Sequence, residues 1–215
     1  MTDLKLDADH EGSFTGRAAA LQAVHAALRG RRFVADTLAD MRAQGRLAGR
    51  EAALAMEVAL GAIRHAGTIQ QVLRRVAEFD ERRIKTELRA SLYTAAYQII
   101  WLDRIPLFAA VDEAVSLTRR AAGKHAAGMA NAVLRNLTRA IELRREPWQR
   151  LNCRQVRVSW DEACSFKLDV LPAPEGEAGR RAHWSAATGE RPDRYRLLVE
   201  RFGPEAAERL SLIHI

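Results

Sequence analysis

The stretch that decides the fold runs from residue 85 to residue 143 and reads KTELRASLYTAAYQIIWLDRIPLFAAVDEAVSLTRRAAGKHAAGMANAVLRNLTRAIEL. Apolar residues recur in it every three to four positions, which is the period of a helix that buries one face. In its first third, one face carries Leu88, Leu92 and Ile99, and a second face carries Tyr93 and Tyr97. A helix with two apolar faces is typical of the centre of a bundle.

Two breaks divide this stretch into three helices. Pro106 disfavours helix at the residue before it and suits the first turn of the helix that follows. Gly123 lies in a short Ala-Gly-Lys loop, and so short a loop joins helices that pack side by side in opposite directions. We therefore expect helices at residues 85–102, 107–121 and 125–143, with the last two antiparallel.

The helical period continues toward the N-terminus. Thr15 suits an N-cap, because its hydroxyl can accept from the unpaired N–H groups of a first turn. Gly67 followed by Thr68 indicates a helix end and a new start. Gly61 lies inside a helical pattern at a cost of about 1 kcal/mol relative to Ala, so we expect a close helix–helix contact there. The expected segments are residues 15–29, 33–44 and 50–76, the last split at Gly67.

The two ends of the chain differ from this helical region. The first 13 residues are polar and acidic, which predicts a flexible tail. Beyond Pro147, residues 155–160 and 166–170 alternate between apolar and polar, which predicts a small β-hairpin. Residues 171–192 are rich in Pro, Gly and Ala and read as linker. The expected organisation is an acidic tail at 1–13, a helical domain at 14–145, a linker with a β-hairpin at 146–192, and the start of a truncated linker helix at 193–215.

Composition narrows the class of protein. The chain has 215 residues, a formal net charge of +7 and a hydrophobic fraction of 48%, as expected of a globular protein with a polyanionic partner such as RNA or DNA. No apolar run approaches the roughly 20 residues of a membrane span, so we expect a cytoplasmic protein. Cys153 and Cys164 form no CxxC pair, and no His/Cys cluster has the spacing of a metal site.

Several segments, taken in order, resemble the NusB family. Arg17–Val24 is similar to its arginine-led first helix, and the stretch from Leu88 to Pro106 is similar to its central helix. Asp112 departs from the usual Asn of the fourth segment, which puts a role of that amide in doubt. The matching segments are Arg17–Val24, Leu60–Arg64, Leu88–Pro106, and Ala110–Val115 followed by Asn131–Arg135.

The resemblance implies an all-α NusB-like bundle of about seven helices in two packed sub-bundles, with a small C-terminal hairpin and linker extension. Within it, the chain resembles the NusB-like N-terminal domain of the RsmB (Sun/Fmu) 16S rRNA cytosine-5 methyltransferases. Arg64, the Asn-Ala-Val-Leu-Arg sequence that starts at Asn131, and the Arg201–Glu205 segment favour this branch. The glycine-rich loop for S-adenosylmethionine and the Pro-Cys motif of the catalytic half do not occur in the sequence.

Three functions follow as hypotheses. The first is an RNA-binding domain that positions ribosomal RNA for a methyltransferase module not present in this chain; the chain itself has no catalytic residue and needs no cofactor, and S-adenosylmethionine enters only if a catalytic half follows. The second is a free-standing antitermination factor that binds a boxA-like leader RNA with NusE. The third is a helical protein-interaction module, in which the arginines keep the surface soluble.

Candidate RNA ligands follow from charge and from the resemblance. The N-terminus of a helix and the planar guanidinium of arginine both suit binding of a phosphate. The alternative interpretation is that these basic residues lie on a solvent-exposed face and form ordinary ion pairs. Arg64 and Arg135 could also pair with Glu113. The stripe of Tyr93, Tyr97 and Trp101 is better explained by core packing than by base stacking. The expected RNA ligands are Arg17, Arg29, Arg31, Arg32, Arg64, Lys124, His125 and Arg135, and the expected structural residues are Gly61, Pro106, Glu113 and Asn131.

Overall fold

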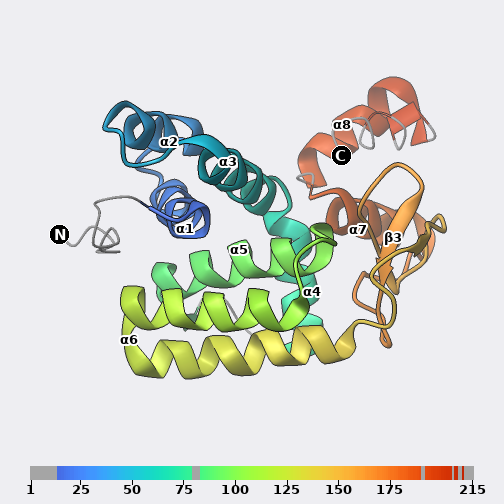
Figure 1. Ribbon diagram of the computed structural model, residues 1–215. Coiled ribbons are helices and arrows are strands. Elements are labelled where there is room, and N and C mark those ends of the chain that lie inside the picture. The colour runs from blue at the N-terminus through green and yellow to red at the C-terminus, as the bar shows by residue number, and fades with distance from the viewer. Residues whose placement is uncertain (1–13, 79–82, 190–191, 205, 208–209, 211–215) are drawn as a thin grey trace. The chain divides into compact units, whose positions relative to one another are not determined.

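The computed structural model describes residues 14–78, 83–189, 192–204, 206–207 and 210, and it is mostly helical (Figure 1). The expectation of an all-α fold with a small C-terminal β element is confirmed. The chain forms two compact units, one from Met1–Arg64 and Asp80–Arg135 and the other from His65–Phe79 and Asn136–Ile215. Among the described residues, no helix is both long and apolar enough to span a bilayer.

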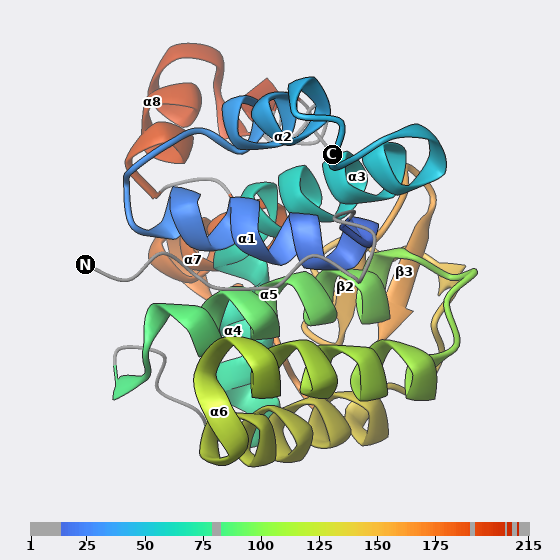
Figure 2. The same ribbon diagram turned by 60° about the vertical axis from the view of Figure 1, so that its left-hand side comes forward.

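The first unit is built entirely from helices. The helix α1 contacts α2, α3 and α5, and α3 also packs on α5. Both ribbon views place α5 between α1 and α6 (Figures 1 and 2). The elements are α1 (Gly16–Leu28), α2 (Val34–Ala43), α3 (Gly49–Arg64), α5 (Thr86–Trp101) and α6 (Leu107–Ala140), of which α6 belongs to this unit as far as Arg135.

The predicted cap and the predicted central helix are both confirmed. The Thr15 hydroxyl accepts from the N–H of Ala18 at 3.2 Å and so caps α1. In α5, every residue from Ala90 to Trp101 is buried, as well as Leu88. A helix buried on all sides supplies the core against which its neighbours pack.

Gly123 makes two helices of α6. Its backbone has φ 88° and ψ 176°, values that only glycine adopts without strain, and the chain reverses there. Figure 1 shows the two segments lying side by side in opposite directions, as the short loop predicted. Pro106 immediately precedes the first residue of α6.

At Gly61, α3 packs closely against Tyr97 of α5. A Cβ atom at this position would lie 2.0 Å from Cζ of Tyr97, far inside van der Waals contact. The expectation that a close helix–helix contact explains this glycine is confirmed.

The second unit combines α4 with the C-terminal part of the chain. Its helices α4 and α7 pack on each other, as do α7 and α8. The strands form one antiparallel sheet in the order β1-β3-β2. The elements are α4 (Ala66–Ala77), β1 (Glu146–Pro147), β2 (Gln155–Arg157), β3 (Glu162–Ser165), α7 (Gly176–Thr188) and α8 (Pro192–Phe202).

Three local expectations need correction in this unit. The boundary between α3 and α4 lies at His65, before Gly67, because α4 already begins at Ala66. The second hairpin strand lies at 162–165 instead of 166–170; Val156 pairs with Cys164, and Phe166 follows the strand in an isolated bridge with Ile141. Composition suggested linker across residues 171–192, but α7 occupies part of it.

Tertiary packing explains why α7 is a helix in spite of its composition. Trp184 is 2% exposed and packs with Tyr195 and Ala207, and the imidazole of His183 lies 2.8 Å from the carbonyl oxygen of Pro172. At the other end, Gly67 of α4 approaches the backbone of Gly189. These contacts bury one face of α7 and order a segment whose sequence is poor in apolar residues.

Candidate nucleic-acid interface

Arg17 is tied into the first unit. Its Nε donates to Oε1 of Gln98 at 2.6 Å, and a terminal nitrogen bonds the carboxylate of Glu113. This cluster connects α1, α5 and α6 in a position where the Arg17 side chain is 23% exposed. A guanidinium has five N–H donors, so this cluster leaves donors for a further acceptor. Arg17 is therefore first a structural residue, and contact with RNA remains a prediction.

Glu113 and Asn131 also have partners inside the unit. Glu113 pairs with Arg17, whereas the sequence left open a pairing of Glu113 with Arg64 or Arg135. Asn131 accepts from Nε of Arg135 through its side-chain oxygen at 2.8 Å, one helical turn along α6. Arg135 is exposed, so this hydrogen bond orients its guanidinium at the surface.

The turn between α1 and α2 carries three exposed arginines. Arg29 follows the last residue of α1, and Arg31 is next along the turn beyond Gly30. Arg32 is 2.5 Å from the carboxylate of Asp40, which raises the pKa of this guanidinium through a hydrogen bond and charge attraction. The structure thus brings together three of the predicted RNA ligands at one end of α1.

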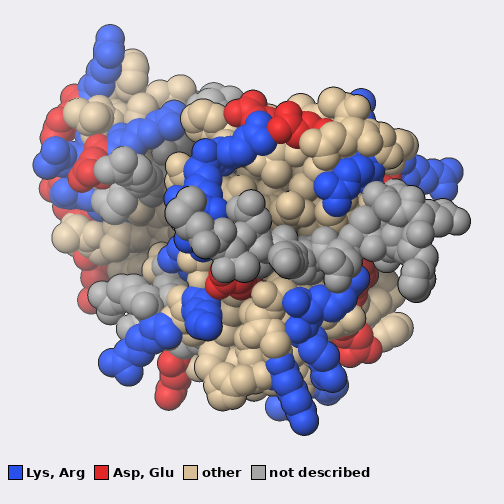
Figure 3. All heavy atoms as spheres, turned by 90° about the vertical axis from the view of Figure 1, so that its left-hand side faces the viewer, with Lys and Arg blue, Asp and Glu red and all other residues tan. Residues whose placement is uncertain are grey.

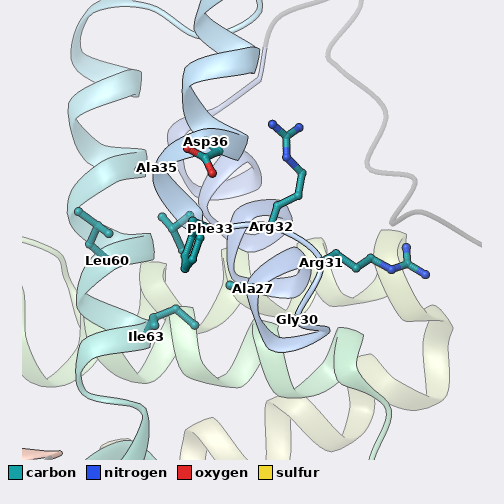
Figure 4. A pocket seen from close by; sticks show the side chains of 10 residues that line it. Ala27, Gly30, Arg31, Arg32, Phe33, Ala35, Asp36, Leu60 and Ile63 are labelled. Carbon is teal, nitrogen blue, oxygen red and sulfur yellow. The ribbon is translucent and has the colours of Figure 1, made fainter.

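Beside this turn the surface is hollowed. An open hollow of about 900 Å³ lies between the turn, the start of α2 and the end of α3. Figure 4 shows Phe33 standing in it opposite Leu60 and Ile63, with Arg31 and Arg32 directed outward. Phe33 is 79% exposed, although it is one of the largest apolar side chains of the unit.

Phe33 is not among the ligands expected from the sequence, where it stands only as the first residue of a helix. In the structure it is the N-cap of α2 and makes no side-chain capping bond. Phe is an unfavourable N-cap, since it cannot accept from the first turn. An aromatic residue in a capping position directly after two arginines is the signal that could have found it.

The other predicted ligands lie exposed at separate places in the unit. Arg64 is the last residue of α3, and Lys124 and His125 follow the kink of α6. With Arg29, these three side chains form no hydrogen bond or ion pair to another described residue. Lys124 and His125 open the second segment of α6, where the helix dipole adds positive potential. Basic side chains that have no acidic partner among the described residues are available to an anionic ligand.

Figure 3 looks onto the left-hand side of Figure 1, the side on which α6 reverses direction. Lysine and arginine side chains project from this face in several places, with fewer acidic side chains between them. Such an excess of positive charge favours the approach of a polyanion.

The aromatic stripe of α5 belongs to the core. Tyr93, Tyr97 and Trp101 are all buried, so the preference for core packing over base stacking is confirmed. The ring of Tyr97 stacks on Trp101 with centroids 5.4 Å apart, and its hydroxyl donates to Glu57 at 2.6 Å. Burial and this hydrogen bond raise the pKa of Tyr97 well above its ordinary value.

Within the described part of the chain, no group of three or more His, Cys, Asp or Glu side chains is placed to hold a metal ion. His25 is 4% exposed, and burial lowers its pKa although Glu87 lies 3.5 Å away. Cys164 is buried in β3, which raises the pKa of its thiol to about 12. Burial also raises the pKa of the Cys153 thiol.

Comparison with known proteins identifies the larger part of this chain. The model of the NusB family matches residues 15–139. The transcription antitermination protein NusB of Heliobacterium modesticaldum (strain ATCC 51547 / Ice1) is 32% identical over 127 residues, which are 59% of this chain and 62% of that protein. The chain thus covers less than two thirds of that relative. With its helical unit and a family match over more than half of its length, the chain belongs to the NusB family.

Proposed function

We propose that this chain is an RNA-binding domain that positions ribosomal RNA for a cytosine-5 methyltransferase module outside residues 1–215. The observation that carries RNA binding is a set of exposed basic side chains that have no acidic partner among the described residues of a NusB-family domain: Arg29, Arg64, Lys124 and His125. The methyltransferase branch is supported by the Asn-Ala-Val-Leu-Arg sequence at 131–135 and by the Arg201–Glu205 segment.

The physical basis of binding is the neutralisation of phosphates. Each phosphate that a lysine or arginine neutralises releases a counterion, so affinity falls as salt rises. For single-stranded RNA, the slope of log affinity against log salt is about −0.7 per neutralised phosphate. A site that uses Arg29, Arg64 and Lys124 therefore has a slope of roughly −2 from these three residues.

The test measures binding of fluorescently labelled fragments of 16S ribosomal RNA by anisotropy across a salt series. We expect measurable affinity at low salt and a shallower slope for the double variant Arg29→Gln/Lys124→Gln. Arg42→Gln is the matched control: this arginine is exposed in the last turn of α2 and has no ion pair to a described residue. Absence of binding at low salt, or equal losses in the double variant and the control, contradicts the proposal.

A second candidate function is supported by the similarity to an antitermination protein. In this case the domain binds a boxA-like leader RNA together with NusE. A ternary complex of the chain, NusE and boxA RNA that does not form on a scrambled RNA supports this function. Preference for 16S fragments, with no effect of NusE, supports the first.

A further inference from the structure

The hollow beside the α1–α2 turn has two apolar walls that face each other. Phe33 forms one wall, and Leu60 and Ile63 of α3 form the other (Figure 4). Phe33 is 79% exposed and Leu60 is 39% exposed, so the chain's own described side chains do not fill the space. A planar apolar group placed between these walls would contact an aromatic face on one side and aliphatic carbon on the other.

The rim of this hollow is charged. Arg31 and Arg32 line it, Arg29 is adjacent, and the acidic groups nearby are Asp36 and Asp40. The three arginines exceed the two carboxylates by one positive charge, and Arg32 is engaged by Asp40. Guanidinium groups at the edge of an apolar slot suit a ligand with a flat apolar part and an attached anion.

We propose that this hollow holds one unstacked base of single-stranded RNA, stacked on Phe33, with the adjoining phosphates against Arg29 and Arg31. The inference rests on the proposed RNA-binding function and names the site at which a base is held. A nucleotide combines a flat aromatic base with a phosphate, which is the combination that this slot and its rim accommodate. An apolar protein helix would instead cover these arginines and desolvate them, which disfavours that occupant.

Aromatic rings bind bases in a sequence-tolerant way, because every base has a π face. Loss of one stack lowers affinity by roughly 5- to 150-fold. The hollow is therefore a general contact for single-stranded RNA, and it does not select a particular sequence.

The experiment uses the whole chain and a labelled single-stranded oligoribonucleotide of mixed sequence. About 12 nucleotides suffice, since single-strand-binding domains cover roughly 4–16. Phe33→Leu keeps an apolar side chain but removes the ring, and Phe33→Trp keeps a stacking surface. Phe108→Leu is the matched control, because Phe108 is also strongly exposed, at 72%, and does not line the hollow.

We expect Phe33→Leu to weaken binding at least about fivefold with an unchanged salt slope, and Phe33→Trp and Phe108→Leu to bind like the unaltered protein. Arg31→Gln should instead make the salt slope shallower by about 0.7. Ultraviolet crosslinking to RNA that contains 5-iodouridine should label Phe33. A folded Phe33→Leu variant that binds RNA as well as the unaltered protein overturns the base site alone, whereas unaltered protein that binds no RNA at low salt overturns the proposed function with it.

If a protein occupies the hollow, RNA binding is unaffected by Phe33→Leu and the crosslink maps elsewhere, so this outcome also overturns the proposal. Circular dichroism of each variant shows whether it is folded. The backbone carbonyl of Phe33 accepts from Thr37, a bond that a side-chain change preserves, so the Phe33 variants should fold.

Discussion

Replacing Gly61 with alanine sets two physical effects against each other. In an exposed helix interior, alanine is more favourable than glycine by about 1 kcal/mol. At Gly61 the added methyl group would lie 2.0 Å from Cζ of Tyr97 and 2.3 Å and 2.5 Å from its two Cε atoms. Ordinary carbon contacts are about 3.5–4.0 Å, so the ring or the helix has to move by roughly 1.5 Å.

The Tyr97 ring has little room to move. It is 6% exposed, it stacks on Trp101, and its hydroxyl is bound to Glu57. Overpacking of such a site costs about 1–3 kcal/mol. After the gain in helix propensity is subtracted, we expect Gly61→Ala to lower the free energy of unfolding by about 2 kcal/mol, because so short a contact lies at the costly end of the overpacking range.

Gly128 provides the matched control. It is exposed on α6, and a Cβ atom there has no other heavy atom within 4 Å. Gly128→Ala should therefore raise stability by up to about 1 kcal/mol. Urea unfolding followed by circular dichroism and tryptophan fluorescence compares both variants with the unaltered protein.

A double variant that combines Gly61→Ala with Tyr97→Ala shows whether the Tyr97 ring causes the loss of stability. Tyr97→Ala alone opens a cavity and should be destabilising. In the Tyr97→Ala protein the methyl group added by Gly61→Ala meets no ring, so this substitution should raise the free energy of unfolding there. If Gly61→Ala is as stabilising as Gly128→Ala when Tyr97 is present, α3 does not pack on α5 as closely as described.

Three further outcomes follow from buried or paired groups. Arg17→Ala should cost about 1–2 kcal/mol of stability, and a double-mutant cycle with Glu113→Gln should show coupling; additive effects would argue against the ion pair. Burial lowers the pKa of His25 in the folded state, so the unfolded state binds more protons, and stability should fall as pH drops below about 6.5. His25→Gln should reduce this loss of stability at low pH, and identical pH profiles of the variant and the unaltered protein would refute the role of His25. Because its pKa is about 12, the buried Cys164 should react with iodoacetamide at pH 8 only after unfolding, whereas early labelling of Cys164 ahead of Cys153 in mass spectra would contradict its burial.

The helical part of this fold could be predicted from local pattern. The period of apolar residues places α5, the hydroxyl of Thr15 identifies a cap, and Gly123 marks the reversal within α6. These signals depend on residues close in sequence, so they need no knowledge of what packs against them. The segments that resemble the NusB family likewise fixed the fold class before any coordinates.

The second unit depended on contacts that sequence does not display. Residues 176–188 are poor in apolar residues and rich in glycine and alanine, and they form α7 because Trp184 and His183 find partners in other segments. The strand at 162–165 was shifted from its expected place, because register is decided by the partner strand and not by alternation alone.

The candidate site likewise divides into features that local sequence predicts and features that depend on tertiary contacts. Sequence alone determined an all-helical, basic protein of the NusB family, and it named the arginines that are candidates for contact with RNA. Only the tertiary structure decided which cations are engaged: Arg17 is bound to Gln98 and Glu113, and Arg32 to Asp40, while Arg29 has no such partner among the described residues. It also placed Phe33 opposite α3. The physical reason is that charge and helical period are local properties, whereas ion pairs and hollows arise between residues that are far apart in the chain.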